Sequence, residues 1–177
     1  MRERGRRLGM RLASLASAAW VNLPAGFEGR DCRGPACAAW RRVAEEVFGP
    51  GAPEAAPWVM EGVTEVAGEV VFQGQEPVGG ALRWRHAYLP ETTGYLGALA
   101  VRPRWRRMGL GAALLARAVF FMAAEGRQSV ELDTADDRVQ AIRLFAAAGF
   151  RPMPENAEEQ RRWECALRAA AEGGGGP

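Results

Sequence analysis

The stretch from Ala112 to Ala124 constrains the fold more than any other part of the chain, because Arg117 is its only polar residue. A helix of this composition is buried on most of its surface. With 13 residues it is too short to cross a bilayer, which takes about 20 apolar residues. We therefore predict a helix packed in the protein core, against a sheet.

Three β-rich runs precede this helix and predict the sheet. They cover residues 66–72, 78–88 and 92–101, and Gln73-Gly74-Gln75 makes a tight turn between the first two. Consecutive strands joined by a tight turn predict an antiparallel meander. Residues 35–48 carry apolar side chains at helical spacing between two Gly-Pro pairs, which predicts an amphipathic helix on this sheet.

Further elements follow the buried helix. Residues 129–133 predict a short strand, and the run Thr134 to Asp137 resembles a capping box that opens a helix through Ala148, with Gly149 as its stop. Residues 150–153 and 162–167 predict terminal strands. Helices and strands thus alternate without a simple repeat, which predicts a mixed α/β protein of the α+β class.

The 177 residues suit one compact domain with a basic N-terminal addition. Arg2 to Arg11 is basic and the following stretch to Val21 is small and apolar, with two interrupting serines. A secretory or organellar leader is one interpretation of this pattern, and a frayed tail or a short amphipathic helix is the one we favour. We expect a partly disordered extension over 1–30, one domain over 31–168 and a flexible Gly-rich tail over 169–177.

Composition argues against several functions. All 23 basic residues are arginine, and a chain without lysine lacks the residue that a Walker-type phosphate loop or a Schiff-base enzyme needs. The net charge of +2 is too small to indicate a nucleic-acid partner, although the N-terminal arginines leave that class open.

Histidine and cysteine usage also limits the chemistry. His86 is the only histidine, and the three cysteines lack C-x-x-C spacing, so we expect no metal site. No G-x-S-x-G elbow accompanies His86, which argues against a Ser/His/Asp hydrolase. We expect reduced thiols and a cytoplasmic location.

One turn does suggest a ligand. Leu99 to Leu115 reads L-A-V-R-P-R-W-R-R-M-G-L-G-A-A-L-L, in which an arginine-glycine turn joins a strand to the buried helix. The first N–H groups of a helix are unpaired and carry partial positive charge, so Gly109 and Gly111 would let a phosphate reach bare backbone. A tight turn without a ligand explains the same residues, and the surrounding motifs must decide.

Three motifs in order resemble the GNAT superfamily of acyl-CoA-dependent N-acyltransferases. They are L-A-V-R-P at Leu99 to Pro103, R-R-M-G-L-G at Arg106 to Gly111, and A-I-R-L-F-A-A-A-G-F at Ala141 to Phe150. The resemblance implies a central, mostly antiparallel, splayed sheet flanked by helices, and acetyl-CoA as cofactor. It also implies that the pantetheine arm pairs with strand backbone and that the pyrophosphate binds the helix N-terminus.

The same resemblance assigns cofactor-binding positions. The arm would contact Leu99, Ala100 and Val101, with the N–H of Val101 nearest the thioester carbonyl. The pyrophosphate would contact Arg106, Arg107, Met108, Gly109, Leu110, Gly111 and Ala112, mainly through backbone, and Arg138 and Phe145 complete the set.

Two positions depart from the family pattern. Phe145 stands where the family often has the tyrosine that protonates the leaving thiolate, and Arg138 replaces an asparagine. A phenyl ring donates no proton, so water, another residue or the absence of catalysis would explain Phe145. An acyl-CoA-binding sensor or interaction module is therefore the alternative to an enzyme.

The catalytic candidates are weaker. Tyr95 shares strand parity with Leu99 and Val101 and therefore points to the same face, where it could replace the phenol, although a packing role explains it too. The general base stays open among His86, Glu61 and Glu131.

The acceptor is not readable from the sequence. Trp58 and Trp84 are candidates for an acceptor pocket, and Arg83 and Arg85 share one face that could bind an acidic group, although core packing and an exposed charged face explain them too. We expect N-acetylation of a primary amine on a small molecule or peptide, no nucleic-acid or membrane partner, and leave a homodimer open.

Overall fold

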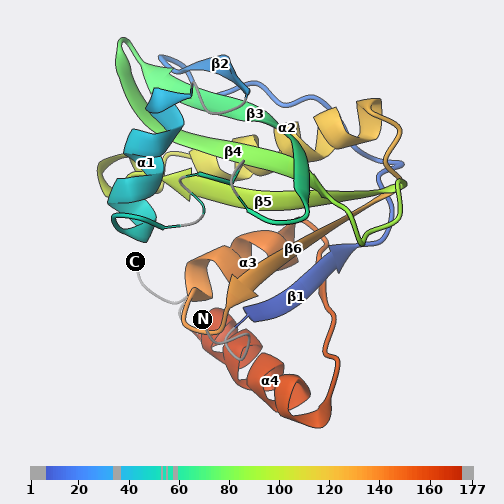
Figure 1. The fold of residues 1–177 in the computed structure, drawn as a ribbon. Coiled ribbons are helices and arrows are strands. Elements are labelled where there is room, and N and C mark those ends of the chain that lie inside the picture. Colours follow the sequence, from blue (N-terminus) through green and yellow to red (C-terminus); the bar gives the residue numbers. More distant parts are fainter. Residues whose placement is uncertain (1–6, 34–36, 53, 55, 58–59, 173–177) are drawn as a thin grey trace. The chain divides into compact units, whose positions relative to one another are not determined.

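The computed structural model describes residues 7–33, 37–52, 54, 56–57 and 60–172 (Figure 1). These residues form two compact units, which we describe separately. The larger unit holds Ser14–Val130, and the smaller unit holds the described residues before Ser14 and after Val130.

The chain forms seven strands and four α-helices over its described residues. The strands are β1 (Arg7–Leu12), β2 (Glu28–Arg33), β3 (Val63–Gln73), β4 (Glu76–His86), β5 (Thr93–Val101), β6 (Ser129–Ala135) and β7 (Arg151–Pro152). The helices are α1 (Ala38–Phe48), α2 (Leu110–Ala124), α3 (Val139–Ala147) and α4 (Ala157–Glu172), with a 3-10 turn, η4 (Pro103–Trp105), before α2. Hydrogen bonds order the strands β2-β3-β4-β5 in the larger unit and β6-β1-β7 in the smaller unit. The predicted mixed fold, with a mostly antiparallel sheet flanked by helices, is confirmed.

The larger unit is built on the predicted meander. Strands β2 to β5 pair in antiparallel fashion, and α1 and α2 both pack on β4 and β5. Trp40 of α1 is fully buried against Gly80 of β4, where a Cβ would lie 3.1 Å from the indole ring. A Cβ at position 80, also 2.8 Å from the Glu69 carbonyl oxygen of β3, would therefore force α1 or β3 to shift.

Helix α2 is buried along most of its length, as its composition predicts. Its single polar residue, Arg117, is also buried, and the guanidinium donates two hydrogen bonds to the Glu69 carboxylate, one of them from Nε to Oε2 at 2.7 Å. The paired charge is what makes an arginine tolerable inside this layer.

In the smaller unit, β1 pairs with β7 through Met10 and Pro152, and Leu8 and Met10 are fully buried. The prediction of a frayed or helical segment is therefore wrong for residues 7–12. The alternation of Arg7, Leu8, Gly9 and Met10 is a strand pattern hidden in a run rich in arginine. The predicted domain limits at residues 31 and 168 fall inside β2 and α4.

Two other predictions for the smaller unit are wrong. Thr134 belongs to β6, and α3 begins after Arg138 without a side-chain cap, so the capping box does not form. Residues 162–167 lie in α4, where Trp163, Ala166 and Ala170 form a buried stripe at helical spacing. The Asn156 side chain caps this helix by accepting from the Glu159 N–H at 2.9 Å. Helix α4 also includes residues 169–172 of the predicted tail, and 173–177 lie outside the described residues.

The expectation of reduced thiols fails for two of the three cysteines. Cys32 at the end of β2 and Cys37 before α1 form a disulfide, with Cα atoms 5.6 Å apart, whereas Cys165 is free and exposed. Disulfides are uncommon in the cytoplasm, so these two cysteines no longer support a cytoplasmic location. Within the described residues, no helix is long and apolar enough to cross a membrane, and no cluster of three metal-ligating side chains occurs.

Candidate functional site

A bulge in β5 sets the directions of its side chains. Leu82 pairs with Ala98 but Arg83 pairs with Leu96, so Gly97 is an extra residue on β5. The Trp84 ring lies over this glycine, where a Cβ would be 2.0 Å from the indole. The bulge therefore needs glycine and reverses the side-chain alternation on either side of it.

The predicted position of Tyr95 is wrong because of this bulge. Tyr95 packs with Ala98 and Ala100 in the core that contains Trp40 and Trp84, so it lies on the opposite face from Leu99 and Val101. Only 7% of Tyr95 is exposed.

Near its end, β5 directs some of its backbone groups away from β4. The Arg102 N–H donates to the Val78 C=O at 2.9 Å, which makes these two residues a hydrogen-bonded antiparallel pair. Because such pairs alternate along a ladder, Leu99 and Val101 direct their N–H and C=O groups away from β4. The Val101 carbonyl accepts from Arg106 Nε at 3.0 Å on that side.

The chain leaves β5 through a well-anchored corner. The Arg102 guanidinium donates to Glu46 at 2.6 Å, to Glu76 at 3.0 Å and to the Pro77 carbonyl at 2.9 Å. Trp105 is buried and its Nε1 donates to Gln73 Oε1 at 3.0 Å. These contacts fix the start of the arginine-glycine turn, and the importance of Arg102 was not predicted from the sequence.

The turn itself ends in an uncapped helix N-terminus. Gly109, with φ of 79°, is the N-cap of α2 and offers no side chain to the helix, and the first turn contains no acidic residue. The helical hydrogen bonds begin from the Ala113 N–H to the Gly109 C=O at 3.1 Å, so the N–H groups of Leu110, Gly111 and Ala112 precede them. A helix N-terminus with these N–H groups and no acidic side chain in its first turn can bind an anion.

The side chains around this N-terminus add positive charge. Arg106, Arg107, Met108 and Ala112 are exposed, Gly111 is half-buried, and only Leu110 turns its side chain into the core. Arg107 has a φ of 66°, a left-handed backbone that a non-glycine residue seldom adopts. The residues predicted to contact the cofactor over 99–101 and 106–112 thus lie in the larger unit, at the end of β5 and the start of α2.

Two candidate bases lie at one end of the meander. His86 is 7% exposed, and its Nε2 accepts a hydrogen bond from Trp84 Nε1 at 3.1 Å, so that nitrogen is already an acceptor. Glu61 is exposed in the turn before β3, next to Gly62, whose carbonyl accepts from the Ala87 N–H at 2.9 Å. Glu61 and His86 thus lie on adjacent segments of the chain.

The other predicted site residues belong to the smaller unit. Glu131 of β6 lies 3.8 Å from the Arg11 guanidinium, and Arg138 is the exposed N-cap residue of α3. Phe145 is buried, with its ring centroid 5.9 Å from that of Phe150. Packing within this unit thus explains the phenyl ring of Phe145 without a ligand.

The acceptor candidates have structural roles. Arg83 donates to Glu125 at 2.6 Å and Arg85 to Glu91 at 2.9 Å, so each guanidinium already has a carboxylate of this chain. Trp84 is part of the core, and Trp58 lies outside the described residues.

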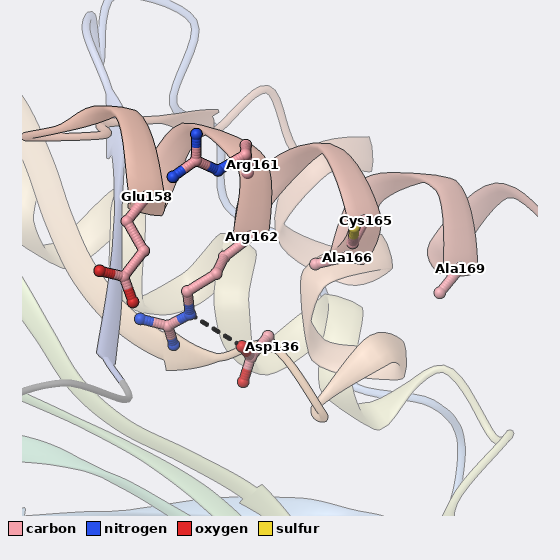
Figure 2. A pocket seen from close by; sticks show the side chains of 7 residues that line it. All are labelled: Asp136, Glu158, Arg161, Arg162, Cys165, Ala166 and Ala169. Carbon is pink, nitrogen blue, oxygen red and sulfur yellow. Dashed lines mark hydrogen bonds and ion pairs between the residues drawn. The ribbon is translucent and has the colours of Figure 1, made fainter.

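A hollow of about 430 Å³ lies along α4 in the smaller unit (Figure 2). Its lining includes Arg161, Cys165 and the pair formed by Arg162 Nε and Asp136 Oδ2 at 2.9 Å, and none of the predicted site residues. The hydrogen bond from Arg162 holds the pKa of Asp136 below its usual value.

This ion pair gives a pH prediction. A carboxylate whose pKa is lowered by folding stabilises the protein above its unfolded pKa of about 4 and loses that contribution as the pH falls through the folded value. An Arg162→Gln variant should therefore differ less from the wild type in unfolding midpoint at pH 3 or below than at pH 7. Denaturation at both pH values measures this, and an equal difference at both would contradict it.

The fold and the turn together define a class of protein in which β5, the last strand of an antiparallel meander, leads through an uncapped turn into a buried helix. The model of the acetyltransferase (GNAT) family matches residues 37–150, and the chain belongs to this family. A comparison with curated proteins finds no match.

Solved structures show the same fold. A tandem GNAT protein from the clavulanic acid biosynthesis pathway superposes with a TM-score of 0.65 at 16% identity, over 83% of this chain and 50% of that one. A GCN5-related N-acetyltransferase from Sphaerobacter thermophilus gives 0.58 at 24% identity, over 84% and 49%. An aminoglycoside N-acetyltransferase in complex with CoA gives 0.61 at 19% identity, over 76% and 95%. The chain thus spans about half the length of the first two.

Proposed function

We propose that this protein is an N-acetyltransferase that uses acetyl-CoA and acetylates a primary amine of a small molecule or peptide. The observation that carries the proposal is the uncapped N-terminus of α2 at Gly109, within a domain of the GNAT family. A pyrophosphate would accept hydrogen bonds from the N–H groups of Leu110, Gly111 and Ala112. Arg106 and Arg107 would add positive charge, and the backbone of Met108 belongs to the same turn.

The last residues of β5 would hold the pantetheine arm and the thioester of the cofactor. The outward N–H and C=O groups of Leu99 and Val101, on either side of Ala100, suit the amide groups of a pantetheine arm. Acetyl-CoA supplies a thioester carbonyl for attack by the amine, and the Val101 N–H would stabilise the negative charge that develops there. We propose direct attack, without an acyl-enzyme.

Proton transfer is assigned only as a set of candidates. We propose His86, Glu61 and Glu131 as candidate bases, and we propose no thiolate donor, because Tyr95 is buried on the other face of β5. His86 could accept a proton at Nε2 only by giving up the bond from Trp84. The variant that lacks the true base should lose the acidic limb of the pH-rate profile.

Phe145 supports a second candidate function. A phenyl ring cannot protonate a leaving thiolate, so a protein that binds acyl-CoA without transferring the acyl group would also fit this sequence. Arg138 and Phe145 would then contact the cofactor without taking part in catalysis.

Calorimetry with acetyl-CoA, followed by free-thiol release with a panel of amines, peptides and aminoglycosides, tests both functions. Aminoglycosides belong in the panel because one of the structural relatives is named an aminoglycoside N-acetyltransferase. Binding with turnover supports the enzyme, binding without turnover supports the sensor, and no binding overturns both. Because the chain has no lysine and one free cysteine, Cys165, an unchanged intact mass after incubation with acetyl-CoA would support direct attack.

A further inference from the structure

Part of the N-terminal stretch that the sequence predicts to be a partly disordered extension runs beside α2. We call residues 14–27, between β1 and β2, the N-terminal strap; they form the blue coil that leads to β2 in Figure 1. At its start, Leu15 is buried and its N–H donates to the Gln128 carbonyl at 3.1 Å. At its end, the Phe27 N–H donates to the Pro24 carbonyl at 3.3 Å.

Arg117 holds the middle of the strap. Its guanidinium lies 3.7 Å from the ring centroid of Trp20, and its Nη1 donates to the Val21 carbonyl at 3.1 Å. Glu69 fixes the same guanidinium from the other side with two hydrogen bonds. The buried charge of α2 is therefore used to attach the strap to the helix.

From this anchor the strap reaches the proposed pyrophosphate turn. Pro24 Cγ lies 3.8 Å from the place where a Cβ of residue 109 would sit. Arg117 lies eight residues after Gly109, a rise of about 12 Å along a helix, and a fully extended chain from Val21 to Pro24 would span about 10 Å. The strap therefore runs along α2 toward the N-terminus of the helix, and Pro24 lies beside Gly109, the N-cap residue.

We propose that the strap is a built-in part of the acyl-CoA site, in which the contact of Trp20 with Arg117 holds Pro24 as one wall of the turn. This inference rests on the proposed function. A fixed apolar wall keeps water from one side of the pyrophosphate and so strengthens the hydrogen bonds from the helix N–H groups. It also organises the site before the ligand arrives, which improves affinity. Trp20 and Pro24 are thus positioning residues.

Truncation of Trp20 is expected to leave the unit folded, because Trp20 is 46% exposed and Val21 is 38% exposed. We expect Trp20→Ala to weaken CoA binding about tenfold, measured by calorimetry. Trp20→Phe, which keeps a ring over Arg117, should restore most of the affinity. Pro24→Gly removes the wall but not the anchor and should weaken binding similarly.

Proteolysis gives an independent readout. Chymotrypsin cleaves after exposed aromatic residues, and CoA at saturation should slow cleavage after Trp20 in the wild-type protein. Wild-type affinity in both Trp20→Ala and Pro24→Gly, or a cleavage rate that CoA does not change, would overturn the role of the strap while leaving the proposed function intact. Failure of the wild-type protein to bind CoA would overturn the proposed function and, with it, this inference.

Discussion

A Gly109→Glu variant is expected to bind acetyl-CoA about 100-fold more weakly than the wild type, a loss of about 2.7 kcal/mol. The carboxylate would stand at the N-cap of α2, where it can accept from the N–H groups proposed for the pyrophosphate and repel that anion. Calorimetry with acetyl-CoA measures the loss. Thermal unfolding checks that the variant is folded.

Two matched variants separate charge from backbone strain. Gly109→Gln has nearly the same size and the same strain at a φ of 79° but carries no charge, so it should lose less affinity than Gly109→Glu. Gly126→Glu places the same charge at a glycine with a φ of 85° and open space around it, just beyond the other end of α2. It should bind acetyl-CoA like the wild type. Equal affinities for Gly109→Glu and Gly126→Glu would exclude the turn as the pyrophosphate site.

The elements that the sequence predicts well are those whose signal is local. The meander over β3 to β5 follows from alternating β-rich runs and the Gln73 to Gln75 turn, and α2 follows from one long apolar run. The arginine-glycine turn is equally local, because a helix N-terminus and its glycine are neighbours in sequence. The structure joins β5 to α2 through this turn, and Gly109 is the N-cap of the helix.

The directions of side chains in β5 could not be predicted in the same way. A bulge is decided by what fills the space above the strand, here the Trp84 indole over Gly97, and that contact joins two strands. Counting by twos through the bulge puts Tyr95 on the wrong face. The predictions of catalytic residues are the least accurate, because they depend on which face of the strand a residue occupies.

The elements of the smaller unit are difficult to predict from the sequence for a related reason. In α4 the buried residues Trp163, Ala166 and Ala170 include two alanines, so the helical stripe is barely visible as hydrophobicity. Strand β1 is short and arginine-rich, and its partner β7 has two residues more than 130 positions later. The disulfide between Cys32 and Cys37 likewise depends on how β2 and α1 meet.

The largest stability effect is expected at the ion pair between Glu69 and Arg117. Both side chains are about nine-tenths buried, and Glu69 lies so close over Gly29 of β2 that a Cβ there would be 1.7 Å from Oε1. Removing one partner leaves the other charge buried without its counterion, which costs about 3–5 kcal/mol. We therefore expect Arg117→Met and Glu69→Gln each to lower the free energy of unfolding by about that amount, measured by denaturant titration.

The double variant distinguishes a buried charge from simple loss of packing. Arg117→Met combined with Glu69→Gln leaves no uncompensated charge, so it should be more stable than either single variant, and the double-mutant cycle should show a coupling of about 3 kcal/mol or more. Additive losses would mean that each side chain acts through packing alone. Since Arg117 also holds Trp20 and Val21, the double variant should recover stability while CoA binding stays weakened, because the anchor of the strap is still missing. Stability and affinity would then separate in one protein, as expected if this buried arginine serves both the core and the ligand site.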